Sequence, residues 1–192
     1  MKSRKNGIVG KLCSLAAAKF LFTSEIKWII IITERMFDTR GGKMKILIIN
    51  GPNLNFLGIR DKEVYGREDF SSLLGMIRRH AGEIGAEVDF FQSNSEGGLI
   101  DRIQAAYRDG TEGMVINPGA YSHYSYALRD ALDSYHTFPK IEVHISDIMQ
   151  REDFRHTSVT GEVCDHQIVG HGLNGYLEAM DMLVKWDNKE LP

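Results

Sequence analysis

The chain has 192 residues, 43% of them hydrophobic and 26% charged, which is typical of one α/β domain with a sizeable core. Its two cysteines provide neither a disulfide framework nor a zinc-binding spacing, which indicates a reducing compartment. The formal net charge of −3 is unevenly spread, because residues 1–43 carry a balance of +6 and residues 44–192 one of −9.

Residues 1–43 differ in kind from the rest. Their basic start resembles a targeting element, but Lys19 interrupts the apolar stretch and no convincing cleavage site follows. The apolar run at 28–32 is too short to span a bilayer, so we expect no membrane segment. The Arg-Gly-Gly-Lys before Met44 could be encoded by a purine-rich ribosome-binding sequence. We therefore expect translation to begin at Met44, with residues 1–43 as upstream DNA read in frame; the alternative is a poorly ordered basic extension.

From Met44 onward, strand-like and helix-like segments alternate. The predicted strands are 45–50, 87–93, 113–119, 140–146 and 165–170, and the predicted helices are 68–85, 95–110, 123–135 and 173–188. Asp69 is suited to begin the first helix and Gly85 to end it. This alternation predicts a single α/β domain at 44–192, a flavodoxin-like, doubly wound sheet of five parallel strands in the order 2-1-3-4-5.

Polar side chains gather at the carboxyl ends of the predicted strands, where such sheets bind their ligands. They are Asn53, Arg60 and Tyr65 after the first strand, Asn117 and His123 after the third, Glu142, His144 and Ser146 on one face of the fourth, and Arg151 and Arg155 beyond it. Each has an ordinary alternative, such as ring packing, turn stabilisation or a solvated charge. Their meeting at one edge favours a site. Asp130, by contrast, has the pattern of ordinary helix polarity.

The sequence lacks the motifs of several function classes. It has no metal-ligand spacing, no dinucleotide or Walker loop, and no Ser or Cys nucleophile motif. A signalling module of this fold would need an acidic cluster after the first strand, and a flavin carrier a Ser/Thr-rich phosphate loop there; the segment NGPN offers neither. The residues favour proton transfer on a polar, anionic small molecule without a metal or organic cofactor.

Four segments together resemble the type II 3-dehydroquinate dehydratases. They are NGPNLNFLGIR with YG at 65–66, INPGAYSHYSYALRDAL, IEVHISDIMQREDFR and VGHGLNGYLEAM. The resemblance covers residues 44–192 and implies a cofactor-independent hydro-lyase that converts 3-dehydroquinate to 3-dehydroshikimate through an enolate. It also implies a cytoplasmic dodecamer of four trimers, with no nucleic acid or membrane partner. Aromatic biosynthesis and quinate breakdown both use this step, and the sequence does not choose between them.

The resemblance also implies a role for each site residue. Tyr65 is the base, Arg60 favours its phenolate, His144 is the general acid, Glu142 orients His144, and Asn53 holds a water against the enolate. Substrate-binding positions are Asn117, His123, Arg155, the backbone N–H groups of Ile145 and Ser146, and Asp130 from a neighbouring subunit.

One departure concerns the loop after the first strand. The family usually has Arg-Glu-Pro there, whereas this chain has Asp61 and Lys62 after Arg60. Without the proline, we expect a larger entropic cost of loop closure and weaker substrate binding.

Overall fold

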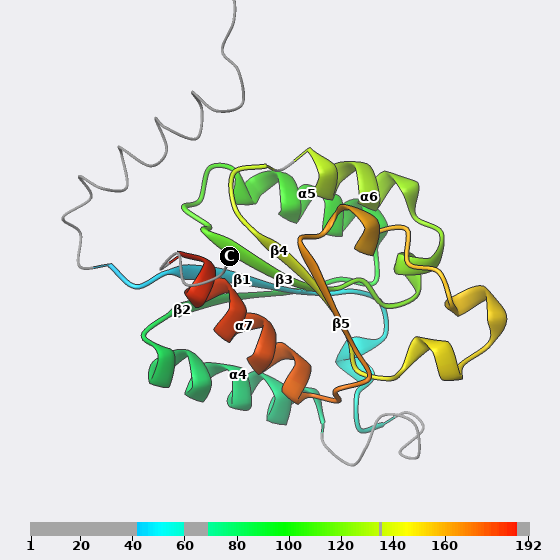
Figure 1. The fold of residues 1–192 in the computed structure, drawn as a ribbon, viewed down its shortest axis with the longest axis horizontal. Helices are drawn as coiled ribbons and strands as arrows, with labels where there is room; N and C mark the ends of the chain where they lie inside the picture. The colour runs from blue at the N-terminus through cyan, green and yellow to red at the C-terminus, as the bar shows by residue number, and fades with distance from the viewer. Residues whose placement is uncertain (1–41, 60–68, 135, 188–192) are drawn as a thin grey trace, which may run out of the picture. The chain divides into compact units, whose positions relative to one another are not determined.

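The structure is a computed structural model that describes residues 42–59, 69–134 and 136–187. The elements discussed below belong to one compact unit, Lys43–Pro192. Figure 1 shows a twisted central sheet with helices on both faces. Among the described residues, no helix has the length and apolar character needed to cross a bilayer.

The strands in the described part of the chain form one parallel five-stranded sheet in the order β2-β1-β3-β4-β5. They are β1 (Lys45–Asn50), β2 (Glu87–Gln92), β3 (Gly113–Asn117), β4 (Lys140–His144) and β5 (His166–Val169). The predicted fold class and strand order are confirmed. β1 and β3 lie at the centre and are buried almost throughout, which explains their near-continuous apolar sequences.

Helices cover both faces of the sheet (Figure 1). α4 (Phe70–Ile84) and α7 (Asn174–Asp187) pack together on one face, and α5 (Glu96–Ala106) and α6 (Tyr126–Asp133) on the other. Alternate residues of β1 serve the two cores: Ile46 and Ile48 pack with α4 and α7, whereas Leu47 and Ile49 pack with α5 and α6.

The first helix begins and ends where the sequence predicts. The Asp69 carboxylate accepts a hydrogen bond from the backbone N–H of Ser72, and Gly85 ends α4 in the left-handed conformation at φ 70°.

Two other predicted helices are shorter than expected. α5 ends at Ala106 rather than at Gly110, because the N–H groups of Tyr107 and Arg108 bond three residues back and tighten the chain into a turn. The helix predicted at 123–135 begins only at Tyr126, because Ser125 caps α6; a separate 3-10 helix, η3 (Gly119–His123), precedes it.

The loops after β1 and β3 leave the sheet in close contact. The N–H of Gly51 donates to the carbonyl oxygen of Asn117 at 2.7 Å. A Cβ atom on Gly51 would lie 2.3 Å from the carbonyl oxygen of Pro118, so only glycine fits there. This is the point where the strand order reverses, and it sets the position of both loops.

Candidate active site

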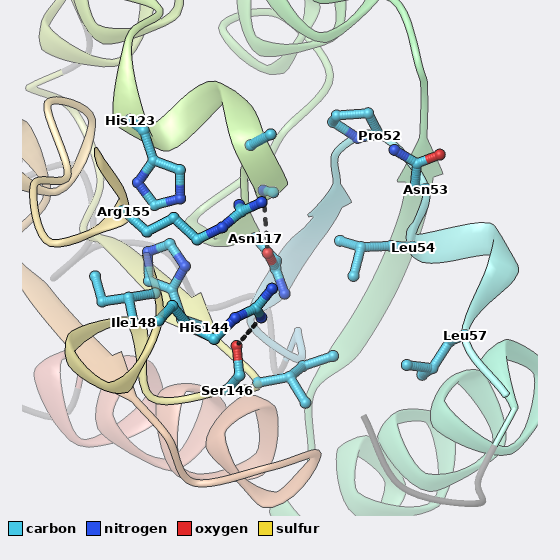
Figure 2. A pocket seen from close by; sticks show the side chains of 14 residues that line it. Pro52, Asn53, Leu54, Leu57, Asn117, His123, His144, Ser146, Ile148 and Arg155 are labelled. Atoms are coloured by element: carbon cyan, nitrogen blue, oxygen red, sulfur yellow. Dashed lines mark hydrogen bonds between the residues drawn. The ribbon is translucent and has the colours of Figure 1, made fainter. Parts of the chain in front are cut away.

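A cavity of about 220 Å³ lies at the carboxyl ends of β1, β3 and β4 (Figure 2). Its walls come from the three loops that follow these strands. Of the predicted site residues, it is lined by Asn53, Asn117, His123, His144, Ile145, Ser146, Arg151 and Arg155. The remaining lining residues are Pro52, Leu54, Leu57, Gly119, Ala120 and Ile148. The topology argument thus placed these polar residues in one cavity.

The other four predicted residues fall into two groups, two outside the described residues and two that do not line the cavity. Arg60 and Tyr65 lie outside the described residues, as do Asp61 and Lys62 from the loop departure. Glu142 lies behind His144, at 0% exposure. Asp130 lies on α6 and does not line the cavity; its side chain is 74% exposed and lies 3.3 Å from the Arg129 guanidinium.

His144 and Glu142 form a buried pair at the end of β4. The Nε2 atom of His144 lies 2.7 Å from Oε1 of Glu142, as expected for two residues on the same face of a strand. Since a carboxylate only accepts, Nε2 carries a proton, and Nδ1 is the nitrogen left for a substrate. The backbone beyond is fixed as well, because Gly170 and Gly172 donate to the carbonyls of His144 and Ile145.

Three further side chains donate to Glu142. Oε1 accepts from Ser158 at 2.5 Å and from Gln167 at 2.8 Å, and Oε2 accepts from Thr160 at 2.5 Å. Burial alone would raise the pKa of Glu142. The hydrogen bonds and charge from His144, followed by the bonds from Ser158 and Thr160, outweigh it and leave the pKa lowered.

His123 is a second histidine in the wall. Its ring is nearly parallel to that of His144, with ring centroids 6.3 Å apart. Nδ1 lies 2.9 Å from the carbonyl oxygen of Thr157, which only accepts, so Nδ1 carries a proton. Burial lowers the pKa of His123, and the charges of His144 and Arg155 act in the same direction. A neutral His123 therefore keeps Nε2 as a hydrogen-bond acceptor.

The Asn117 side chain belongs to a chain of hydrogen bonds that runs away from the cavity. The Gly119 N–H donates to Asn117 Oδ1 at 3.2 Å, Asn117 Nδ2 donates to the Tyr176 hydroxyl at 2.9 Å, and that hydroxyl donates to Asn50 Oδ1 at 2.6 Å. A backbone N–H can only donate, so the first bond fixes the direction of the others. Asn117 is thereby held with its second Nδ2 hydrogen available to a ligand.

Among the described residues that line the cavity, the charged ones are Arg151 and Arg155. Arg151 donates to Ser146 Oγ at 3.3 Å, and Arg155 is 2.8 Å from Glu152 and 4.7 Å from the centre of the Phe154 ring. Figure 2 shows His123, Arg155 and His144 side by side in the wall. The cavity therefore combines positive charge with donors, which suits an anionic polar ligand. No group of three or more potential metal ligands occurs in the described residues.

Sequence reasoning did not find Ser158, Thr160, Gln167 or Tyr176 as site residues. Gln167 lies opposite Glu142 in the β4–β5 register, but the register is a tertiary fact. A polar residue in a short predicted strand was the available signal, and it was too weak to use. Tyr176 lies in an amphipathic helix, where an aromatic residue usually only fills the core.

Comparisons with known proteins agree on one family. The family model described as dehydroquinase class II matches residues 44–184. The 3-dehydroquinate dehydratase of Lachnospira eligens is 60% identical over 141 residues, 73% of this chain and 96% of that protein. The 3-dehydroquinate dehydratase of Lachnoclostridium phytofermentans is also 60% identical over 141 residues, which are 73% of this chain and 97% of that protein. The crystal structure of the type II dehydroquinase from Butyrivibrio crossotus matches with a TM-score of 0.73 and 60% identity, covering 73% of this chain and 97% of that one.

Proposed function

This chain belongs to the class II dehydroquinase family and catalyses the dehydration of 3-dehydroquinate in the shikimate pathway, and from this premise we propose how its residues divide the work. The observation that carries the proposal is the His144–Glu142 pair, which lies beside a cavity that Arg151 and Arg155 help to line.

The reaction has two proton transfers. Removing the proton at C2 of the substrate, next to the C3 ketone, gives an enolate, and hydroxide then leaves from C1. A departing hydroxide needs a proton in the transition state, and a positioned histidine supplies it. His144 fills this role, because Glu142 holds its Nε2 proton and leaves Nδ1 to face the leaving group.

Tyr65 is the proposed base, supported by the family resemblance. A free phenol has a pKa of about 10, so it needs a nearby positive charge to lose its proton at neutral pH. Arg60 supplies that charge and then stabilises the enolate. Asn53, in the cavity wall, is proposed to hold a water against the enolate oxygen.

Substrate binding falls to the remaining wall residues. Arg155 and the backbone N–H groups of Ile145 and Ser146 suit the substrate carboxylate, since charge-assisted hydrogen bonds to anions are strong. Asn117 donates through Nδ2 and a neutral His123 accepts through Nε2, so together they suit two substrate hydroxyls. Every step of this scheme is carried by side chains and backbone, without a metal or organic cofactor.

Asp130 completes the site in the proposed assembly. Its exposure on α6, away from its own cavity, supports its use by a neighbouring subunit of a dodecamer built from four trimers. The catalytic domain is residues 44–192, and residues 1–43 are an extension or an upstream start; the mass of the protein from its host decides between them. A cytoplasmic location is consistent with the two cysteines.

The first experiment follows the ultraviolet absorbance of the conjugated product from 3-dehydroquinate. Wild type is compared with Tyr65→Phe and His144→Asn. We expect loss of at least about 10²-fold in kcat for each, because general acid–base groups contribute at least that much. Wild-type rates in either variant would remove that residue from its role without changing the reaction.

A further inference from the structure

We propose that Ser158, Thr160 and Gln167 are positioning residues of the active site, which hold Glu142 as a carboxylate and through it keep His144 ready to donate a proton. This inference rests on the role of His144 proposed above. None of the three lines the cavity, so they act on the reaction through Glu142 and not by touching the substrate.

The geometry around Glu142 favours the ionised carboxylate. Its oxygens accept from four side chains: His144 at 2.7 Å, Gln167 at 2.8 Å, and Ser158 and Thr160 at 2.5 Å. Ser158 Oγ also accepts the N–H of Gly161 at 3.0 Å, and its own proton serves the shorter bond to Glu142 rather than the 3.3 Å contact with Thr160 Oγ1. An ionised carboxylate accepts through both oxygens and so satisfies all four donors at once, in agreement with the lowered pKa of Glu142.

The donors come from three places in the chain. His144 belongs to the same strand as Glu142, Gln167 to β5, and Ser158 and Thr160 to the segment between β4 and β5. Glu142 and Thr160 are fully buried, so water does not replace a lost bond, and one acceptor position of the buried charge stays unfilled. Together the donors replace the water that a buried carboxylate has given up.

The other titratable groups facing Glu142 do not supply this stabilisation. Burial raises the pKa of the Cys164 thiol, and the Glu142 charge raises it further, so the thiol stays neutral. Burial lowers the pKa of His123, which is therefore neutral as well. Lys140, on the same strand, is 3.9 Å from Asp165. In addition to His144, the hydroxyls of Ser158 and Thr160 and the amide of Gln167 are thus the groups that offset the burial of the Glu142 carboxylate.

The consequence for catalysis concerns the orientation of His144. The Glu142 carboxylate accepts the Nε2 proton of His144, which fixes the ring and leaves Nδ1 for the substrate. If Glu142 became protonated, His144 would lose this charged acceptor. Activity should therefore require an ionised Glu142, and weakening its donors should make the enzyme lose activity at a higher pH on the acid side.

The test measures the pH profile of kcat for dodecamer-forming full-length protein with 3-dehydroquinate. Thr160→Val keeps the shape and removes the hydroxyl, whereas Thr160→Ser keeps the hydroxyl. For Thr160→Val we expect the acid limb, the fall of kcat at low pH, to shift to higher pH by at least about one unit, since a hydrogen bond to a charged group is lost. The KM should stay within about twofold of the wild-type value. Thr160→Ser should restore the wild-type limb.

Thr111→Val is the matched control. Thr111 is also buried, and its hydroxyl donates to the Asp109 carboxylate at 2.6 Å, at the far end of the sheet from the cavity. The Thr111→Val substitution should lower the stability of the protein without moving the acid limb of the kcat profile. Identical profiles for wild type and Thr160→Val, or the same shift in Thr111→Val, would overturn the proposal.

Two further variants make the result decisive. If Thr160→Val does not fold, Gln167→Met removes a donor from a half-buried edge strand and must move the acid limb in the same direction. Glu142→Gln separates the two proposals. A normal profile in Glu142→Gln would reject the role of Glu142 itself, whereas an altered profile there with unchanged Thr160→Val and Gln167→Met profiles would reject only the positioning role.

Discussion

At the scale of single residues, the site depends on buried polar side chains whose partners are all specified. Asn117 is 3% exposed and lies in the cavity wall, yet its orientation is set by Gly119 in front and Tyr176 behind. Tyr176 is fully buried, and burial raises the pKa of its hydroxyl, so it stays protonated and donates to Asn50. A helix residue without access to the cavity thus determines which atom Asn117 offers to a ligand.

Tyr176→Phe should therefore affect binding more than chemistry. We expect KM to rise about 3- to 10-fold with kcat nearly unchanged, and the free energy of unfolding to fall by about 1–3 kcal/mol, because two buried hydrogen bonds are lost. Steady-state kinetics and urea unfolding measure the two effects. In an Asn117→Ala background the KM effect should vanish; if it persists, Tyr176 does not act through Asn117.

Glu142 also links the site to acid stability. Its pKa in the folded protein is lowered from the ordinary value of 4.5, so the carboxylate stabilises the fold above that pH and the contribution is lost as pH falls through the folded pKa. Glu142→Gln should lower Tm at pH 7 and give a shallower fall of Tm between about pH 5 and 3 than wild type. Parallel curves for the two proteins would contradict this assignment. Calorimetry over that pH range decides it.

At the scale of elements, the cavity exists because the ends of β1 and β3 are held together. Gly51 is in contact with the backbone of Pro118, and the loops on either side carry Asn53 and Asn117 into the wall. The chain continues from β1 to β2 on one side and from β3 to β4 on the other, so the connections diverge and leave space above the two strand ends.

Gly51→Ala should separate these two loops. The added Cβ would lie 2.3 Å from a carbonyl oxygen of the backbone, so the loops must move apart. We expect a loss of about 1–3 kcal/mol in unfolding free energy and at least a tenfold fall in kcat/KM.

Gly75→Ala is the matched control for that substitution. Gly75 lies on the exposed side of α4, and its Cβ would meet nothing within 4 Å. Alanine there should stabilise by about 0.5–1 kcal/mol and leave kcat/KM unchanged. Equal activity in the two variants would show that the contact at Gly51 does not position the site.

At the scale of the whole molecule, one proposed ligand-binding residue does not reach the cavity of its own chain. Asp130 is highly exposed on α6; exposed Tyr126 lies on the same helix, and exposed Tyr124 precedes it. Exposed aromatic residues near a displaced binding residue support an interface between subunits.

Mixing two inactive variants tests whether Asp130 acts on a neighbour. Asp130→Ala keeps His144, and His144→Asn keeps Asp130, so a mixed oligomer contains native sites only if the two residues meet across an interface. Random assembly of equal amounts should restore about a quarter of wild-type activity. Unrestored activity in a confirmed mixed oligomer would mean that Asp130 does not act in trans; sedimentation and mass measurements establish the assembly.

The sequence by itself determined the fold class, the strand order and the edge of the sheet where polar residues meet. Strand periodicity and the βα alternation are local properties, and the rule that ligands bind at carboxyl ends then placed Asn117, His123 and His144 in one cavity. The pairing of His144 with Glu142 also follows from their spacing of two along one strand.

Tertiary structure alone decided which distant residues support the side chains of the site. Ser158, Thr160 and Gln167 reach Glu142 from 16, 18 and 25 residues away, and Tyr176 reaches Asn117 from 59. The early end of α5 and the divided third helix were also set by turns and caps that compete with helical periodicity. Local patterns report which face of an element is apolar, but a hydrogen bond between elements depends on register and packing, which no short stretch of sequence contains.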